Sequence, residues 1–462
     1  MILEQMYTKC LAQGAYFISS QGEAIIIDPL REVQPYLDLA KEHESTIKYV
    51  FLTHFHADFV SGQVDLAKAT GATVVLGPNA KAGYDYHSAK DGEVFQIGTL
   101  QMEVIHTPGH TMESTCYLLR SEEGKEEALF TGDTLFIGDV GRPDLAAKSD
   151  LTKEDLAGHL YDSLHNRIMP LSDDIIVYPA HGAGSACGKN MSSQTSDTLG
   201  NQKETNYAFK LNREDFIKEL ITGLNAPPSY FPENVAMNKR INTDFDTIIK
   251  RGTTPLSVTA FETLALQGDM LVLDTRSVSA FAKASLPGAW FIGLSGQFAP
   301  WVGAMVKDIN QKIIVLAEEG KEEEVATRLS RVGYDHSLGY LEGGVEAWIE
   351  AGKETVSIQE VTAQEFVDGL SNGSIAYPVD VRKDGEFTTS HIAGISHMPL
   401  DDVHTNSKDL DPSKTYHVHC AGGYRSLIYA SIARSQGIEM VNVLGGYGAI
   451  KKTELGTIKL TE

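Results

Sequence analysis

Residues 53–59 read Thr-His-Phe-His-Ala-Asp-Phe and follow a run of strand-forming residues, KYVFL, at 48–52. Two histidines and an aspartate at this spacing indicate a metal site at the end of a strand. A second metal ion would need one more histidine directly after Asp58, and Phe59 stands there instead. The stretch therefore raises the question whether the site holds one metal ion or two.

Length and charge limit the class of protein. At roughly 150 residues per domain, 462 residues indicate about three domains. Lys plus Arg number 39 and Asp plus Glu number 62, which gives a net charge of −23. So acidic a chain is a poor candidate for binding nucleic acid or an anionic membrane, and we expect a small-molecule substrate.

The cysteines point to a reducing compartment. Cys10, Cys116, Cys187 and Cys420 are far apart and include no C-x-x-C pair, which argues against a disulfide framework or a zinc finger. The first residues lack the pattern of a signal peptide, and no apolar run approaches the ~20 residues of a membrane span. We expect a cytoplasmic protein with free thiols. Cys10 and Cys116 lie in strand-like stretches, and we interpret both as structural.

Three further histidine or aspartate motifs follow strand-like runs in the first part of the chain. They are TPGHT at 107–111, TGDT at 131–134 and PAHG at 179–182. Strand-like runs also occur at 15–19, 24–28 and 72–77, helix-like segments begin near 61 and 152, and Thr152 and Asp155 form a capping box. Because each motif follows a strand, we expect all four to project from strand ends into one cleft.

The remainder of the chain is a repeat of about 100 residues. SVTAFETL at 257–264 matches EVTAQEFV at 360–367, and LEGG at 341–344 matches VLGG at 443–446. Each copy reads as strand, loop, strand, helix and strand, which predicts two small tandem α/β domains. We place the boundary before the first copy near residue 250.

The second copy contains a loop suited to a reactive thiol. Cys420 follows the apolar strand YHVH and opens the loop C-A-G-G-Y-R, after which a helix begins. Backbone N–H groups at a helix start stabilise a thiolate, and Arg425 adds a positive charge. Gly422 and Gly423 let the backbone wrap closely around the sulfur. A buried cysteine without special chemistry is the alternative interpretation.

These residues, with Asp380-Val-Arg382 and SHIAGISHMPL, resemble the rhodanese family of sulfurtransferases. The resemblance implies that Cys420 carries a persulfide as a covalent intermediate, with Arg425 in the same loop. In the first copy, Glu318 occupies the position of Cys420 and Glu323 that of Arg425. Since glutamate cannot carry sulfane sulfur, we interpret residues 255–355 as a degenerate copy used for packing or as an interface, with a modified binding role as the alternative.

The four motifs of the first part resemble the metallo-β-lactamase superfamily, most closely its glyoxalase II and persulfide dioxygenase branches. In the dioxygenase branch two histidines and one carboxylate hold a single Fe(II), and the resemblance transfers these roles to His54, His110 and Asp133. Such a triad leaves one face of the ion open for O₂ and a substrate sulfur. Phe59 has no lone pair, so its presence favours this one-metal form. Zinc as the metal stays open.

Other residues receive less specific roles from the same resemblance. His56, Asp58 and His181 are candidates to orient the ligands, and His56 is also a candidate fourth ligand. Arg142, in the family segment GDVGRPDL, is a candidate contact for an anionic part of the substrate, with a surface salt bridge as the alternative. Cys187, six residues after His181, is a candidate to handle sulfur near the metal or an ordinary buried thiol.

The sequence thus predicts an αββα sandwich at 1–250, a degenerate rhodanese-like α/β domain at 255–355 and an active-type rhodanese domain at 356–462. The order resembles bacterial persulfide dioxygenase–rhodanese fusions of sulfide detoxification. The resemblance implies Fe(II)-dependent oxidation of a thiol persulfide to sulfite by O₂, linked through Cys420 to thiosulfate. The alternatives are a zinc thioester hydrolase of the glyoxalase II type and a non-catalytic sulfur-binding scaffold. We expect no nucleic acid or membrane partner, and a homo-oligomer, either dimer or tetramer.

Overall fold

The computed structural model describes residues 1–147, 151–224, 226–454 and 460–461. Its contacts divide the chain into two compact units, the first with residues 1–247 and 327–335 and the second with residues 248–326 and 336–462. Among the described residues, no helix is both long and apolar enough to cross a membrane.

The first unit is built on two six-stranded sheets within the described residues. In both sheets neighbouring strands follow one another in chain order, from β1 to β6 in the first sheet and from β7 to β12 in the second. The first sheet contains β1 (Ile2–Thr8), β2 (Gln13–Ser20), β3 (Glu23–Ile27), β4 (Thr46–Leu52), β5 (Thr73–Leu76) and β6 (His87–Ser88). The second contains β7 (Val94–Ile97), β8 (Leu100–His106), β9 (Thr115–Arg120), β10 (Glu126–Gly132), β11 (Ile176–Pro179) and β12 (Asp197–Thr198).

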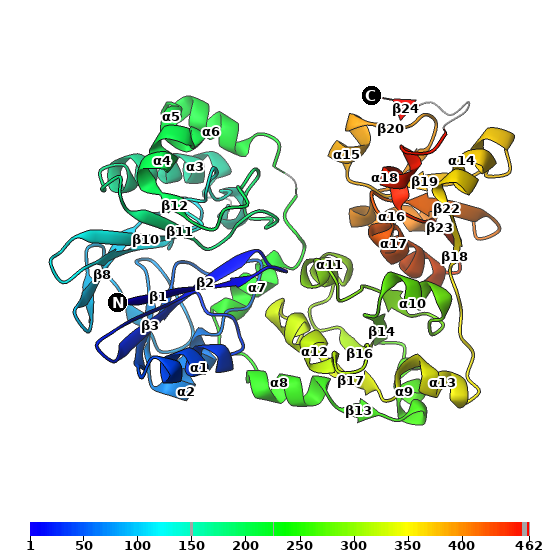
Figure 1. Ribbon diagram of the computed structural model, residues 1–462, viewed down its shortest axis with the longest axis horizontal. Helices are drawn as coiled ribbons and strands as arrows, with labels where there is room; N and C mark the ends of the chain where they lie inside the picture. The colour runs from blue at the N-terminus through cyan, green and yellow to red at the C-terminus, as the bar shows by residue number, and fades with distance from the viewer. Residues whose placement is uncertain (148–150, 225, 455–459, 462) are drawn as a thin grey trace. The chain divides into compact units, whose positions relative to one another are not determined.

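An apolar core joins the facing sides of the two sheets. Phe51 of β4 packs edge-to-face on Tyr117 of β9 with ring centroids 4.8 Å apart, and Tyr16 of β2 contacts Phe130 of β10. Helices cover the outer faces, which gives four layers, helix, sheet, sheet and helix (Figure 1). These helices are α1 (Gln34–Glu42), α2 (Gln63–Thr70), α3 (Lys153–Ser163), α4 (Leu199–Thr205), α5 (Tyr207–Lys210) and α6 (Arg213–Ile221). Helix α7 (Phe231–Asn238) follows them in the chain.

The ends of α3 and α2 and the turn before β2 can be compared with the capping box, the helix stop and the strand-like stretch predicted from the sequence. The predicted capping box of Thr152 and Asp155 is present at the start of α3, which continues into a π-helical turn at Leu164–Ile168. Helix α2 ends at Gly71, whose φ of 74° favours glycine. The strand-like interpretation of Cys10 is wrong, because this residue lies in the turn between β1 and β2, whereas Cys116 lies in β9. All four cysteines are free thiols.

The second unit contains two parallel sheets of five strands each among the described residues, with matching strand order. The order is β13-β17-β16-β14-β15 in the first and β18-β23-β22-β19-β21 in the second, as the sequence repeat predicts. In both copies a buried aspartate at the end of the second strand binds the arginine two residues later, as Asp274–Arg276 and Asp380–Arg382. The fold class predicted from the sequence, a sandwich followed by two rhodanese-like α/β domains, is confirmed.

The elements of the second unit have the following bounds. Helix α8 (Phe245–Gly252) leads into the first copy, which contains β13 (Pro255–Leu256), α9 (Val258–Ala265), β14 (Met270–Asp274), α10 (Val278–Lys283), β15 (Trp290–Phe291), α11 (Phe298–Met305), β16 (Lys312–Leu316), α12 (Glu322–Arg331), β17 (Ser337–Leu341) and α13 (Gly344–Glu350). The second contains β18 (Gln359–Val361), α14 (Ala363–Asn372), β19 (Pro378–Asp380), α15 (Asp384–Thr389), β20 (His391–Ile392), β21 (Ser396–His397), α16 (Val403–Asn406), β22 (Thr415–His419), α17 (Tyr424–Ser435), β23 (Glu439–Val443), α18 (Gly446–Ile450) and β24 (Leu460–Thr461).

Candidate metal centre and thiol loop

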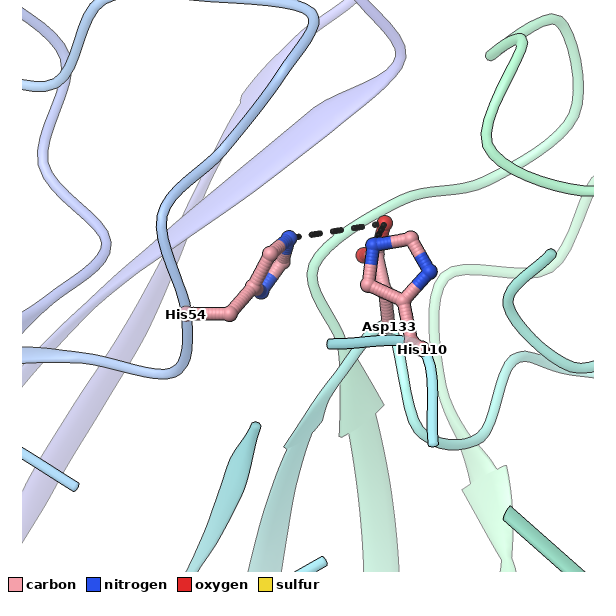
Figure 2. Close-up of side chains that lie close together, drawn as sticks. All are labelled: His54, His110 and Asp133. Carbon is pink, nitrogen blue, oxygen red and sulfur yellow. Dashed lines mark ion pairs between the residues drawn. The ribbon is translucent and has the colours of Figure 1, made fainter. Parts of the chain in front are cut away.

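The predicted triad is brought together in the first unit. His54 follows β4 of the first sheet, His110 lies between β8 and β9, and Asp133 follows β10 of the second sheet. Asp133 Oδ2 lies 3.7 Å from His54 Nε2 and 3.6 Å from His110 Nε2 (Figure 2). All three side chains are buried. Strand ends of both sheets therefore place two imidazole nitrogens around one carboxylate oxygen.

The triad fits a divalent metal ion. Asp133 Oδ2 is buried and has no hydrogen-bond partner among the described residues, which is costly unless a ligand satisfies it. The other histidine nitrogens are already occupied. His54 Nδ1 is 3.0 Å from Thr53 Oγ1, and His110 Nδ1 donates to the Arg142 carbonyl at 2.8 Å. Such contacts fix the ring orientation and leave both Nε2 atoms for a metal.

The protonation states of His54 and Asp133 favour binding of a cation by the triad. Burial and the neighbouring His56 ring lower the pKa of His54 well below its ordinary value, so the ring is neutral, the form that binds a metal. Burial alone would raise the pKa of Asp133. His181 and His54 outweigh burial and hold that pKa far below the usual range. The carboxylate is therefore ionised at neutral pH.

His56, Asp58 and His181 form a second group of possible metal donors, each with one donor atom within 4.8 Å of the others. His181 connects two carboxylates, with Nδ1 2.7 Å from Asp133 Oδ1 and Nε2 2.8 Å from Asp58 Oδ2. The Phe59 ring is fully buried, with its centroid 4.3 Å from that of His56. The second group thus has an aromatic wall where a further histidine would add a ligand.

Residues 53–61, which follow β4 and carry His54, His56 and Asp58, are called the metal loop below. Two buried residues that hold this loop were not predicted from the sequence. Asp28, at the end of β3, accepts from Thr53 N at 2.8 Å and Thr53 Oγ1 at 2.7 Å, and its Oδ1 is 3.1 Å from His56 Nε2. Neither ring nitrogen of His56 has a hydrogen-bond partner among the described residues, and Nδ1 is the one that does not face the Asp28 carboxylate. The signal in the sequence is an acidic residue that ends the apolar run AIII.

Asn238, the last residue of α7, is the second buried residue that holds the metal loop. Its amide nitrogen donates to the carbonyls of His56 and Phe59, both at 2.8 Å. Its amide oxygen accepts from Ser61 N at 2.8 Å and from Ser61 Oγ at 3.0 Å. Asn238 is fully buried, so its side chain clamps the metal loop from a segment almost 180 residues away. Nothing in the local sequence around Asn238 indicates this contact.

Arg142 and Cys187 lie beside the metal centre. Arg142 is 5% exposed, and its guanidinium makes two 2.7 Å hydrogen bonds to Asp144 and one to the Ala186 carbonyl. Cys187 has its sulfur within 4.8 Å of donor atoms of Asp133 and His181. Burial and the carboxylates of Asp58 and Asp133 raise the pKa of the Cys187 thiol well above its ordinary value. Substrate contacts of Arg142 and Cys187 stay predictions.

In the second unit, the loop after β22 cradles the Cys420 sulfur. Gly423 N donates to Cys420 Sγ at 3.1 Å, and Ser426 Oγ lies 3.5 Å from the sulfur. Gly423 has a φ of 98°, a conformation that favours glycine, and α17 begins at the next residue. The loop thus has the backbone donor and helix start that the sequence predicts, and Gly422 lines a cavity beside Cys420.

Arg425 forms an ion pair with Glu386, a residue outside the motifs described from the sequence. Its two terminal nitrogens bind the carboxylate oxygens of Glu386 at 2.6 and 2.7 Å. Arg425 and burial act in opposite directions on Glu386, and the hydrogen bond to Arg425 holds the pKa of this carboxyl below its ordinary value. The positive charge near Cys420 is therefore largely compensated.

The corresponding loop of the first copy carries acidic groups. Glu318 stands at the predicted position after β16 and accepts a hydrogen bond from Ser277 N at 3.2 Å. Glu323 lies in the first turn of α12, together with Glu322 and Glu324. This loop has neither the sulfur nor the arginine of the Cys420 loop.

Known proteins match both parts of the chain. Residues 9–181 match the model of the metallo-beta-lactamase superfamily, and residues 257–351 and 362–453 match that of the rhodanese-like domain. A crystal structure of a metallo-beta-lactamase from Staphylococcus aureus is 30% identical, with a TM-score of 0.66 over 74% of this chain and 98% of that one.

Two kinds of enzyme are among the curated relatives. The human mitochondrial persulfide dioxygenase ETHE1 is 29% identical over 231 residues, which are 49% of this chain and 83% of that protein. The probable hydroxyacylglutathione hydrolase glo2 of Schizosaccharomyces pombe is 34% identical over 173 residues, 36% of this chain. This match spans 62% of the yeast protein, less than two thirds of its length.

Proposed function

Because the chain belongs to the metallo-beta-lactamase superfamily through its first domain and carries two rhodanese-like domains after it, we propose that it is an iron-dependent persulfide dioxygenase coupled to a sulfurtransferase. In the overall reaction a thiol persulfide, O₂ and water give the thiol and sulfite. The similarity to human persulfide dioxygenase supports this assignment.

The observation that carries the proposal is the buried Phe59 ring, which lies beside His56 and His181 of the second donor group and leaves the triad as the complete metal site. A phenyl ring at this position provides no lone pair, which disfavours the two-metal form needed by most hydrolases of this type. Two histidines and one carboxylate with open positions are a donor set that suits non-haem Fe(II). When bound, ferrous iron supplies the one-electron chemistry that lets O₂ react with a persulfide sulfur.

The chain's own residues hold the site in a defined protonation state. Thr53 and the Arg142 carbonyl orient the two histidine rings, and His181 binds the Asp133 oxygen that faces away from them. His181 also contacts Asp58, so one protonated ring offsets two carboxylates. Burial of the whole donor set limits the access of bulk solvent to the metal site, and the one water molecule that the reaction consumes enters with the substrates.

Cys420 would perform the second reaction. Its thiolate attacks the terminal sulfur of a persulfide, the sulfur–sulfur bond of the donor breaks, and the donor thiolate leaves with the electron pair. Sulfite then attacks the outer sulfur of the Cys420 persulfide, which releases thiosulfate and restores the Cys420 thiolate. Gly423 N and Ser426 Oγ stabilise the negative charge on sulfur in both steps. No outside oxidant is needed.

A zinc-dependent thioester hydrolase is the second candidate. The close grouping of His56, Asp58 and His181 favours it, because these donors could hold a second ion despite Phe59. The similarity to the hydroxyacylglutathione hydrolase of Schizosaccharomyces pombe supports the same reading.

The test is to load separate samples of the full chain anaerobically with Fe(II) or Zn(II) and to supply glutathione persulfide. We expect the iron sample to consume one O₂ per sulfite formed, and the zinc sample to consume none. Hydrolysis of S-lactoylglutathione is measured in parallel. Thioester hydrolysis by the zinc sample, without O₂ uptake by the iron sample, would replace the dioxygenase by the hydrolase.

A further inference from the structure

The cavity beside Cys420 is lined by both rhodanese-like domains. It has a volume of about 590 Å³. The second domain contributes the Cys420 loop and Glu386, and the first domain contributes the 295–297 loop and Trp301 of α11. The copy that lacks a cysteine therefore forms part of the site where the other copy has one.

The part of the cavity lining that comes from the first domain, the 295–297 loop and Trp301, is called the wall below. Hydrogen bonds hold it in place on both sides. Before the loop, the Tyr424 hydroxyl donates to the Gly293 carbonyl at 2.7 Å, and Phe291 N donates to Ser431 Oγ at 2.9 Å. At the last residue of α11, the Met305 carbonyl lies 2.6 Å from His404 Nε2. The 295–297 loop and Trp301 are thus fixed against the domain that carries Cys420.

The cavity is larger than an inorganic sulfur donor requires. Sites of roughly 300–1,000 Å³ are typical of drug-sized organic ligands. Sulfite and thiosulfate have only a handful of non-hydrogen atoms and would fill a small part of about 590 Å³. The cavity therefore has room for an organic molecule with the reacting sulfur at one end.

The charges of the lining suit an anionic molecule. Glu386 compensates Arg425, as described above. Lys383 also lines the cavity, is exposed, and has no ion pair among the described residues. An ammonium in this position attracts a carboxylate, and the Trp301 ring offers an apolar surface for the carbon atoms of the same molecule.

We propose that the first rhodanese-like domain is the specificity wall of the Cys420 site, with Trp301 and the 295–297 loop holding the organic body of a carboxylate-bearing thiol persulfide. Lys383 binds its carboxylate. The inference rests on the proposed sulfur transfer at Cys420 and adds the substrate class and the role of the copy without a cysteine. The bonds made and broken are those given above for Cys420, with the organic thiolate as leaving group.

The test compares two sulfur donors, glutathione persulfide and inorganic thiosulfate, with cyanide as the common acceptor and thiocyanate as the product. In Trp301→Ala we expect KM for glutathione persulfide to rise about tenfold, since an aromatic contact to the organic body is lost. KM for thiosulfate and both kcat values should change less than about twofold. Trp301→Phe should recover most of the loss. Leu266→Ala, an 81% exposed apolar residue of the same domain, is the matched control.

The outcomes separate this inference from the function on which it rests. An unchanged KM for glutathione persulfide in Trp301→Ala, or an equal rise for both donors, would overturn the specificity wall while leaving transfer at Cys420 intact. Persistent transfer in Cys420→Ser would instead overturn the proposed function. On the unaltered protein, S-methylglutathione, which has no reactive sulfur, should inhibit thiosulfate turnover competitively. Absence of inhibition at concentrations far above the persulfide KM would count against the wall.

Discussion

Changing Phe59 to histidine (Phe59→His) should convert the site from one metal ion to two. The Phe59 ring centroid lies 4.3 Å from that of His56 and 6.3 Å from that of His181. An imidazole in its place would therefore add a nitrogen to the donors already supplied by Asp58 and His181, whose own donor atoms lie within 4.8 Å. We expect the variant to hold two zinc ions per chain and to gain thioester hydrolysis at the expense of O₂ uptake.

The variant should also depend on metal for stability. Phe59 is fully buried, and a buried phenyl contributes about 1.5–3 kcal/mol. An imidazole without partners costs about 1–3 kcal/mol more. Together these give a loss of about 2.5–6 kcal/mol without metal, or about 5–24 °C in melting temperature at about 2–4 °C per kcal/mol for a unit of this size. Added zinc should restore most of this loss.

The assay is elemental analysis together with thermal melting, each with and without zinc, and Phe59→Leu is the matched control that stays apolar. One metal ion in Phe59→His under saturating zinc, with no metal-dependent melting shift, would refute the role given to Phe59. Two metal ions already present in Phe59→Leu would do the same.

Three more predictions follow from single contacts. Asn238→Ala removes the side chain that holds the metal loop and leaves buried backbone carbonyls without partners. The free energy of unfolding in urea should therefore fall by about 3 kcal/mol, and the bound iron should decrease. A normal iron content would contradict this role of Asn238. Cys420→Ser should keep O₂ uptake and abolish thiosulfate formation, and unchanged thiosulfate formation would contradict its role. Glu386→Gln should lower stability at pH 7 by about 0.5–1 kcal/mol, allowing for solvent exposure of the pair with Arg425. Because the folded pKa of Glu386 is lowered, this difference is present above pH ~4.3 and should vanish as pH falls through the folded pKa; a difference that persists at pH ~2 would contradict it.

Local and repetitive patterns in the sequence were sufficient to predict the fold. Their positions after strands predict that the motifs project into one cleft, and His54, His110 and Asp133 do converge from both sheets. The two copies of the second unit share a strand order because their apolar runs repeat in the same sequence. Periodicity and spacing carry this information within a short stretch of chain.

Contacts between distant segments were beyond the same reasoning. Asn238 reaches the metal loop from α7, and Glu386 reaches Arg425 from α15, and neither contact has a local sequence pattern. Trp301 is an aromatic residue in an apolar helix, which by sequence alone indicates packing and not the lining of a cavity beside Cys420. Cys10 was placed in a strand because its neighbours favour one, whereas the chain turns there to pair β1 with β2.

Anomalous scattering from crystals grown with iron, recorded on both sides of the iron edge, tests the central claim most directly. We predict one iron peak per chain, bonded to His54 Nε2, His110 Nε2 and Asp133 Oδ2. A second metal peak of full occupancy between Asp58 and His181 would contradict the account.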